Sequence, residues 1–149
     1  MAKGFVDLPG LHVTVDEVRY QPEAETPPEQ PHCFVYFISI RNDSLVPVTI
    51  RGRKWVVRNS KGEVTAVEGD GVVGQCPTLA PGEKFSYNSY HLIDHLPAVA
   101  EGSYLGTLDG GKRVIVRIPK AAVLCITKGD SCPKAEEDRA YDAARGLKG

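Results

Sequence analysis

Residues 67–90 read VEGDGVVGQCPTLAPGEKFSYNSY, and three glycines in this stretch have the spacing G-x-G-x-x-G, at Gly69, Gly71 and Gly74. The dinucleotide-binding form of this motif needs a strand before the loop and a helix after it, because the helix N-terminus holds the pyrophosphate. Here two prolines follow the last glycine closely, and proline breaks a helix. The stretch therefore predicts a glycine-rich loop between two strands and excludes a Rossmann fold.

Two interpretations of this glycine loop stay open. In the first, the glycines allow the chain to turn sharply, and their N–H groups bond to neighbouring strands. In the second, Gly69, Gly71 and Gly74 direct successive N–H groups toward one point and cradle an anion, while Arg53 supplies positive charge. The second interpretation makes these four residues a candidate ligand-binding site for pyrophosphate or a nucleotide.

The rest of the chain has the pattern of short strands separated by turns. Residues 12–20 alternate apolar and polar side chains with one change of phase, which is typical of a β-bulge. Residues 34–40 are apolar on both faces, as in a central strand, and residues 21–31 hold four prolines and are predicted to form a loop. About seven to eight such strands, with residues 91–102 as a longer loop, predict an antiparallel β-sandwich.

Length and composition narrow the class of protein. At 149 residues the chain is expected to form one domain, and its net charge of −1 argues against non-specific binding to nucleic acid. No stretch approaches the roughly 18 apolar residues of a membrane span, and the N-terminus has no apolar signal run, so we expect a cytoplasmic protein. Four cysteines without C-x-x-C spacing predict free thiols and no zinc site.

The C-terminal end of the chain differs in kind from the rest. We assign residues 1–126 to the sandwich domain and residues 127–149 to a tail. Within the tail, Pro133 follows a candidate cap, acidic residues come early, and Gly146 comes at the end. This order predicts a short helix, and because its apolar residues are mostly alanine it has little surface to bury.

Few residues suggest catalysis or metal binding. His91 and His95 flank Asp94 at helical spacing, but the segment is short and no third ligand is evident, so we predict no metal site and no cofactor. Cys76 lies beside the glycine loop without a nearby histidine, which predicts a buried and inert thiol. No catalytic residue can be named, and an enzyme is the least supported class.

The most basic local cluster surrounds Trp55. Its members are Arg51, Arg53, Lys54 and Arg58. In one interpretation Trp55 is the core aromatic of the sandwich and the cations lie in solvent on the opposite face. In the other, the cations form a face that meets phosphate or an acidic partner. Strand alternation places Arg53 on the side of Trp55, so its charge should lie near a sheet edge or have a partner such as Glu68 or Asp70.

Several motifs resemble those of the bacterial ApaG family, whose domain also occurs in an F-box protein and a polymerase-delta-interacting protein. They are Arg53-Lys54-Trp55, the run of residues 67–74, Pro77-x-Leu79-x-Pro81-Gly82-Glu83, Phe85-x-Tyr87-x-Ser89 and Gly102-Ser103-Tyr104. The resemblance covers roughly residues 11–124. The chain departs from the family pattern at residues 96–101 and in the tail.

This resemblance implies an immunoglobulin-like or fibronectin-III-like β-sandwich. It also implies a link to cobalt and magnesium tolerance in bacteria, and a role in protein interaction. We therefore predict a non-enzymatic binding module with a protein partner and no cofactor, and no binding to nucleic acid or membrane. The alternative is a pyrophosphate- or nucleotide-binding protein, and a homodimer is also left open.

Overall fold

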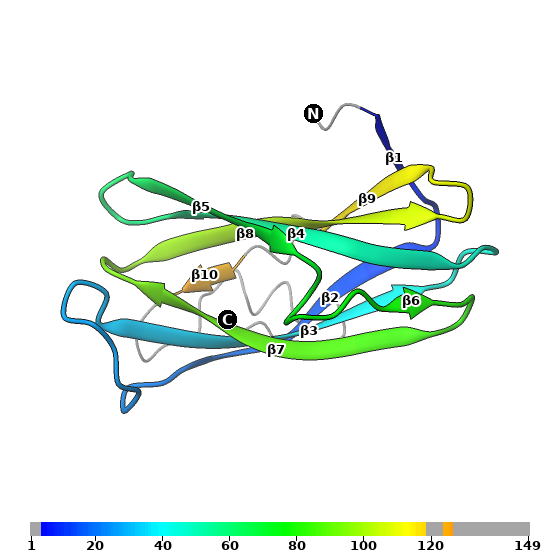
Figure 1. The fold of residues 1–149 in the computed structure, drawn as a ribbon. Coiled ribbons are helices and arrows are strands. Elements are labelled where there is room, and N and C mark those ends of the chain that lie inside the picture. Colours follow the sequence, from blue (N-terminus) through cyan, green and yellow to red (C-terminus); the bar gives the residue numbers. More distant parts are fainter. Residues whose placement is uncertain (1–3, 119–123, 127–149) are drawn as a thin grey trace.

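The computed structural model describes residues 4–118 and 124–126, which form two β-sheets packed face to face (Figure 1). The strands are, in chain order, β1 (Phe5–Asp7), β2 (Leu11–Tyr20), β3 (His32–Asn42), β4 (Val48–Arg58), β5 (Val64–Asp70), β6 (Thr78–Leu79), β7 (Lys84–Ile93), β8 (Ala98–Leu108), β9 (Arg113–Arg117) and β10 (Leu124–Ile126). The predicted all-β antiparallel sandwich is confirmed. The helix predicted in the tail lies outside the described residues.

The larger sheet has seven strands and the smaller sheet has three. The larger sheet has the order β1-β9-β8-β4-β5, with β10 paired to β8 and β6 paired to β4. The smaller sheet has the order β2-β3-β7, so the strand predicted to be central does lie in the middle. Among the described strands, β1 and β9 run parallel and the other pairs are antiparallel.

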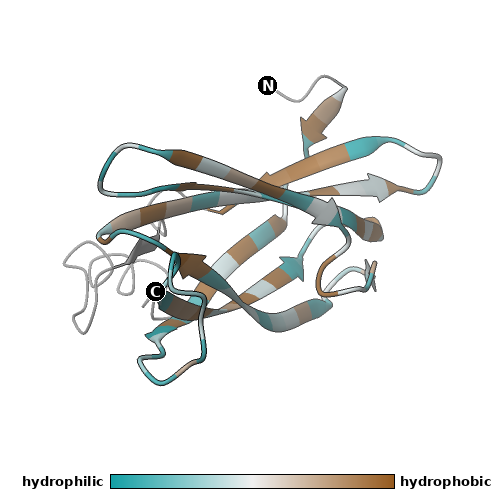
Figure 2. Ribbon diagram, turned by 60° about the vertical axis from the view of Figure 1, so that its left-hand side comes forward, coloured by the Kyte–Doolittle hydropathy of each residue, from teal (hydrophilic) through white to brown (hydrophobic). Residues whose placement is uncertain are grey.

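The core lies between the sheets. Along the strands, hydrophobic residues alternate with hydrophilic ones (Figure 2). Trp55 is the largest of its fully buried side chains, at 2% exposure, which confirms the prediction that it is the core aromatic. Its ring centroid lies 5.0 Å from that of Tyr36 and 4.9 Å from that of His91. A Cβ on Gly102 would lie 3.0 Å from indole carbons of Trp55, so this strand position needs glycine.

Two register shifts set which side chains face the core. The first lies between Val15 and Glu17, at the change of phase that the sequence showed. The second lies between Ile50 and Gly52 in β4, and it places Ile50 and Trp55 on the same buried face although they are five positions apart, an odd number. The extra residue of a bulge shifts the alternation of inward and outward side chains by one position. Side chains after the bulge that would otherwise point to solvent therefore point into the core.

The prediction that residues 91–102 form a long loop is wrong. β7 continues to Ile93 because His91 to Ile93 pair with β3, and β8 begins at Ala98 because its first residues pair with β4 and β10. Only residues 94–97 connect the two strands. The residues around Pro97 do not indicate these pairings, because the ends of a strand depend more on its long-range partners than on local residue preference.

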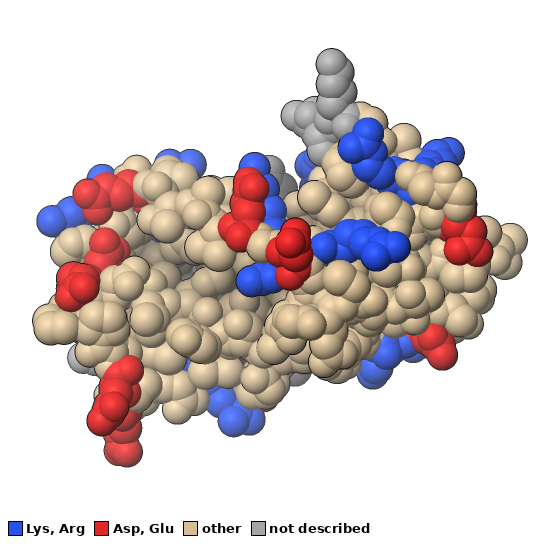
Figure 3. Space-filling model, in the orientation of Figure 1, with Lys and Arg blue, Asp and Glu red and all other residues tan. Residues whose placement is uncertain are grey.

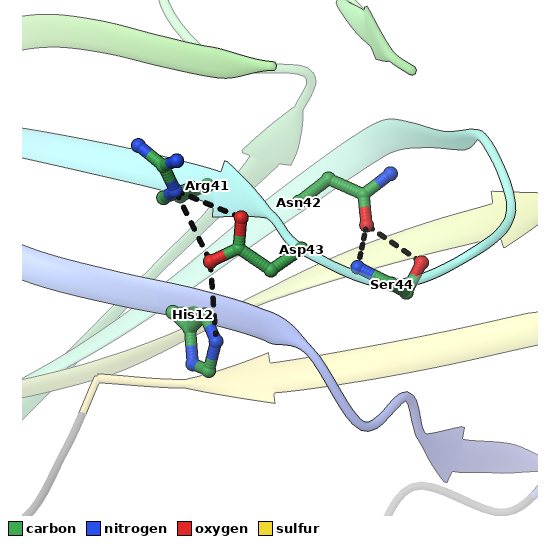
Figure 4. Close-up of polar contacts among 5 residues, drawn as sticks. All are labelled: His12, Arg41, Asn42, Asp43 and Ser44. Carbon is green, nitrogen blue, oxygen red and sulfur yellow. Dashed lines mark hydrogen bonds and ion pairs between the residues drawn. The ribbon is translucent and has the colours of Figure 1, made fainter. Parts of the chain in front are cut away.

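One buried side chain joins the end of β3 to the loop that follows it and to β6. Asn42 is 0% exposed, and its amide nitrogen donates hydrogen bonds to the carbonyls of Val46 and Leu79, at 2.9 and 2.8 Å. Its side-chain oxygen accepts bonds from the backbone N–H and the hydroxyl of Ser44, at 2.9 and 2.7 Å (Figure 4). Beside it, the Asp43 carboxylate accepts two bonds from Arg41 and lies 3.6 Å from the His12 imidazole.

Candidate functional site

The glycine loop connects β5 to β6, as the sequence predicted. Gly71 has a φ of 64°, and its N–H donates to the Arg51 carbonyl at 2.6 Å. Val72 and Gln75 exchange both backbone hydrogen bonds, at 2.7 and 3.0 Å, around a two-residue turn. The two turn residues, Val73 and Gly74, have φ values of 49° and 78°. Positive φ at both positions is typical of a type I′ turn, and it is rare for a β-branched residue such as valine.

Arg53 lies against this loop. Its guanidinium Nη1 donates to the carbonyl oxygens of Asp70 and Gly71, both at 3.0 Å. A Cβ on Gly69 would come within 2.8 Å of the same guanidinium, so Gly69 leaves the space that Arg53 occupies. The predicted partner of Arg53 was a carboxylate, and the structure gives it two backbone carbonyls instead.

The four predicted ligand-binding residues are therefore only partly brought together. Arg53, Gly69 and Gly71 are in contact, whereas a Cβ on Gly74 would meet no atom within 4 Å. The N–H groups of Gly71, Val72 and Gln75 bond to backbone carbonyls of the chain itself. An anion at this loop would compete with those bonds, and anion binding here stays a prediction.

Arg53 also belongs to a cluster of tyrosines between the sheets. Tyr87 and Tyr104 share a hydrogen bond through their hydroxyls, and the ring of Tyr36 meets that of Tyr87 edge to face, at 6.4 Å between centroids. Burial raises the pKa of all three hydroxyls, and the positive charge of Arg53 acts in the opposite direction. The cluster thus keeps neutral hydroxyls beside one half-buried cation.

The two histidines considered as metal ligands lie in different surroundings. His91 is in the core at 8% exposure, and burial lowers its pKa to about 4. Asp94 and His95 lie in the short connection before β8, and a carboxylate from the β4–β5 turn, Glu63, has a ligand atom within 4.8 Å of theirs. Asn59 donates to both carboxylates, and its bond to Asp94 lowers the pKa of that group.

Sequence reasoning missed Glu63 because it is distant along the chain from Asp94. The prediction for Cys76 is also wrong, since this thiol is exposed. Cys76 comes directly after the turn of the glycine loop, and residues 73–76 are all exposed. Cys33 is the buried thiol, and burial raises its pKa.

A hollow of about 1030 Å³ lies on the outer face of the larger sheet. Ser103, Leu105 and Thr107 of β8 line it, and they alternate with Tyr104 and Gly106, which are buried. The hollow therefore lies on the side of the sheet away from the core. Its charged lining residues are the basic Arg51, Arg53, Lys54, Arg113 and Arg117 and the acidic Glu68, Asp70 and Glu101, and Phe5 and Ile115 also line it.

Two outer arginines, Arg51 and Arg113, differ from other arginines of the fold in their partners. Arg19 and Arg41 of the smaller sheet form ion pairs with Glu17 and Asp43. On the outer face, by contrast, Arg51 donates to the Thr107 hydroxyl at 3.0 Å, and Arg113 lies 5.3 Å from the centroid of the Phe5 ring. Basic side chains also gather at the end of the larger sheet where β1 and β9 lie, at the upper right of Figure 3.

The chain is similar to known proteins in its domain family, its sequence and its fold. The ApaG domain family matches residues 22–107. Protein ApaG from Enterobacter sp. (strain 638) is 37% identical over 121 residues, covering 80% of this chain and 96% of the relative. Protein ApaG from Deinococcus radiodurans is 38% identical over 111 residues, covering 74% of this chain and 84% of the relative.

Solved structures give the same result. A crystal structure of a Bordetella pertussis protein assigned as ApaA superposes with a TM-score of 0.66 at 34% identity, covering 76% of this chain and 92% of that one. In the part of the chain that the structure describes, no helix is long and apolar enough to cross a membrane. The match in sequence, in domain and in fold means that this chain belongs to the ApaG family.

Proposed function

We propose that this chain is a non-enzymatic binding module that meets a protein partner with the outer face of its larger sheet. The observation that carries the proposal is the hollow on that face, whose lining combines five basic and three acidic residues with the apolar side chains of Leu105 and Ile115. Concave surfaces that combine an apolar floor with a few charged groups are typical of binding sites. A lining with four arginines that lack a carboxylate partner among the described residues suits an acidic partner.

The placement of the ionisable groups supports a binding role over a catalytic one. Groups with strongly shifted pKa values are typical of active sites when they face a cleft. In this fold His91 and Tyr104, whose pKa values are shifted strongly, lie in the core. Among the described residues, the lining of the hollow includes no histidine, cysteine or tyrosine.

The proposal extends to the cellular role that the family resemblance implies. In this extended proposal, the module acts in the cytoplasm and supports tolerance of cobalt and magnesium through its partner, without holding a metal as a cofactor. The family membership supports this extension. A strain whose copy carries a charge reversal on the outer face would then lose the tolerance as fully as a strain without the gene.

The binding role itself is tested by selecting peptides from a random library on the intact chain. Amide chemical shifts recorded with and without a selected peptide then map the contact surface. We expect the largest shifts at the outer positions of β8 and β9, including Leu105 and Ile115. Selected peptides that shift other surfaces and leave these positions unchanged would contradict the proposal.

A second candidate function rests on the contact between Arg53 and the glycine loop. The guanidinium lies beside Gly69 and Gly71, where a phosphate group would find a positive charge next to a turn of the backbone. In that function the chain binds pyrophosphate or a nucleotide. Its test is the stabilisation experiment described in the Discussion.

A further inference from the structure

The register of β4, β8 and β9 places cations on both sides of each outer hydroxyl of β8. Thr107 pairs with Arg113 of β9, and on its other side its hydroxyl accepts the bond from Arg51 of β4. This row, Arg51–Thr107–Arg113, leaves the threonine O–H free to donate to a ligand, because a hydroxyl has one donor besides its acceptor sites. Two guanidinium groups and one hydroxyl thus face the hollow together.

A second row repeats this arrangement further along β8. Ser103 pairs with Lys54 of β4 on one side and with Arg117 of β9 on the other. Lys54 lies 3.5 Å from the Glu68 carboxylate, and both side chains are at least half exposed. An exposed pair of this kind contributes little stability, and the ammonium group keeps further donors for a ligand.

Apolar side chains separate the two rows. Leu105 lies midway between Ser103 and Thr107 and pairs with Ile115. Since an antiparallel strand rises about 3.4 Å per residue, four residues place the two hydroxyls roughly 13 Å apart. The face therefore offers two cationic positions about 13 Å apart with an apolar position between them.

We propose that these two rows bind an extended acidic peptide with the pattern acid-x-apolar-x-acid, as the partner segment of the binding module proposed above. In an extended chain, side chains at positions i, i+2 and i+4 point to one side, and the outer two lie about 13 Å apart. Each acidic side chain meets one cation–hydroxyl–cation row, and the apolar side chain packs on Leu105 and Ile115. Charge-assisted hydrogen bonds from arginine to carboxylate fix the register of the peptide.

Two features favour a peptide over an inorganic polyphosphate on this face. Leu105 and Ile115 occupy the middle of the site, where a polyphosphate would place further charge on apolar side chains. Glu101 and Glu68 also line the hollow near the Ser103 row. Their carboxylates repel a dense polyanion more than a peptide that carries two separate charges.

The test measures fluorescence anisotropy of a labelled peptide that contains Glu-Thr-Leu-Thr-Glu, titrated with the full chain. The matched control peptide contains Glu-Thr-Leu-Glu-Thr, which has the same composition but places its acids on opposite sides of an extended chain. We expect the first peptide to bind at least about tenfold more tightly, as for the gain of one charge-assisted contact. We also expect its affinity to fall as salt is raised.

Variants locate the binding. Arg117→Gln and Arg113→Gln remove one cation from each row, and each is expected to weaken binding by about tenfold. Arg58→Gln is the matched control, because Arg58 is an exposed cation of β4 outside the hollow. Equal affinity of the two peptides, or an equal loss in all three variants, would overturn the proposal. So would displacement of the peptide by tripolyphosphate at lower concentration than by unlabelled peptide.

The library selection separates failure of this inference from failure of the binding role. If selected peptides map to Leu105 and Ile115 but lack the acid-x-apolar-x-acid pattern, the inference is overturned and the binding role stands. If selected peptides do not contact this face, both proposals are overturned.

Discussion

Replacing Asn42 by alanine should destabilise the fold strongly, because this polar side chain is fully buried and hydrogen-bonded. The asparagine amide is 0% exposed and makes four hydrogen bonds within the chain. Three of them, to the Leu79 carbonyl and to the N–H and hydroxyl of Ser44, are buried. Each buried group left without a partner costs about 1–3 kcal/mol, so we expect a loss of about 3–4 kcal/mol in the free energy of unfolding.

Urea denaturation followed by intrinsic fluorescence measures this loss, and thermal unfolding should show a decrease in Tm of roughly 8–12 °C for a chain of this size. Asn88→Ala is the control, because Asn88 is exposed on β7, and it should change stability by less than about 0.5 kcal/mol. Asn42→Asp tests the reason for the loss. It keeps an acceptor for Ser44 but turns a carboxylate oxygen toward two carbonyls, so it should cost at least as much at neutral pH.

The cost of Asn42→Asp should shrink as the pH falls, because a protonated carboxyl can again donate to one of the two carbonyls. A loss below about 1 kcal/mol for Asn42→Ala would refute the reasoning, since it would mean that water replaces the amide without penalty. Equal losses for Asn42→Ala and Asn88→Ala would refute it as well.

The remaining predictions concern the core, the acid response, the glycine loop and the tail. Trp55→Ala should cost about 3–5 kcal/mol in urea denaturation, and a loss below about 1 kcal/mol would mean that the indole does not support the core. The pKa of His91 is about 4 in the folded chain and has the ordinary value of 6.5 in the unfolded chain. The unfolded chain therefore binds more protons between these pH values, and the free energy of unfolding should fall by about 3 kcal/mol from pH 6.5 to pH 4. In His91→Phe the dependence over this range should be weaker, and an unchanged pH profile would contradict this assignment. If the glycine loop binds pyrophosphate with a Kd of about 0.1 mM, then 10 mM pyrophosphate should raise Tm by roughly 5–11 °C in the wild type and not in Arg53→Ala. We expect instead that pyrophosphate raises Tm no more than chloride does at equal ionic strength, because Glu68 and Asp70 repel anions. Removing residues 128–149 should leave the urea midpoint nearly unchanged, and a loss above about 2 kcal/mol would show that the tail supports the sandwich.

The sequence alone was enough for the fold class, the glycine loop and the core tryptophan. These features follow from local rules: alternation of side chains, glycine and proline at turns, and a change of phase at a bulge. The bulge between Val15 and Glu17 is the clearest case, since the shift in the apolar pattern already marked it.

Only the tertiary structure decided which distant residues meet. The ends of β7 and β8 depend on their pairing with β3 and β4, and the contact of Arg53 with backbone carbonyls depends on the path of the glycine loop. The two cationic rows of the outer face arise from the register of β4, β8 and β9, and residue types along one strand cannot show that register. Local preferences act over a few residues, whereas register is set by the whole set of strands that must bury their apolar faces together.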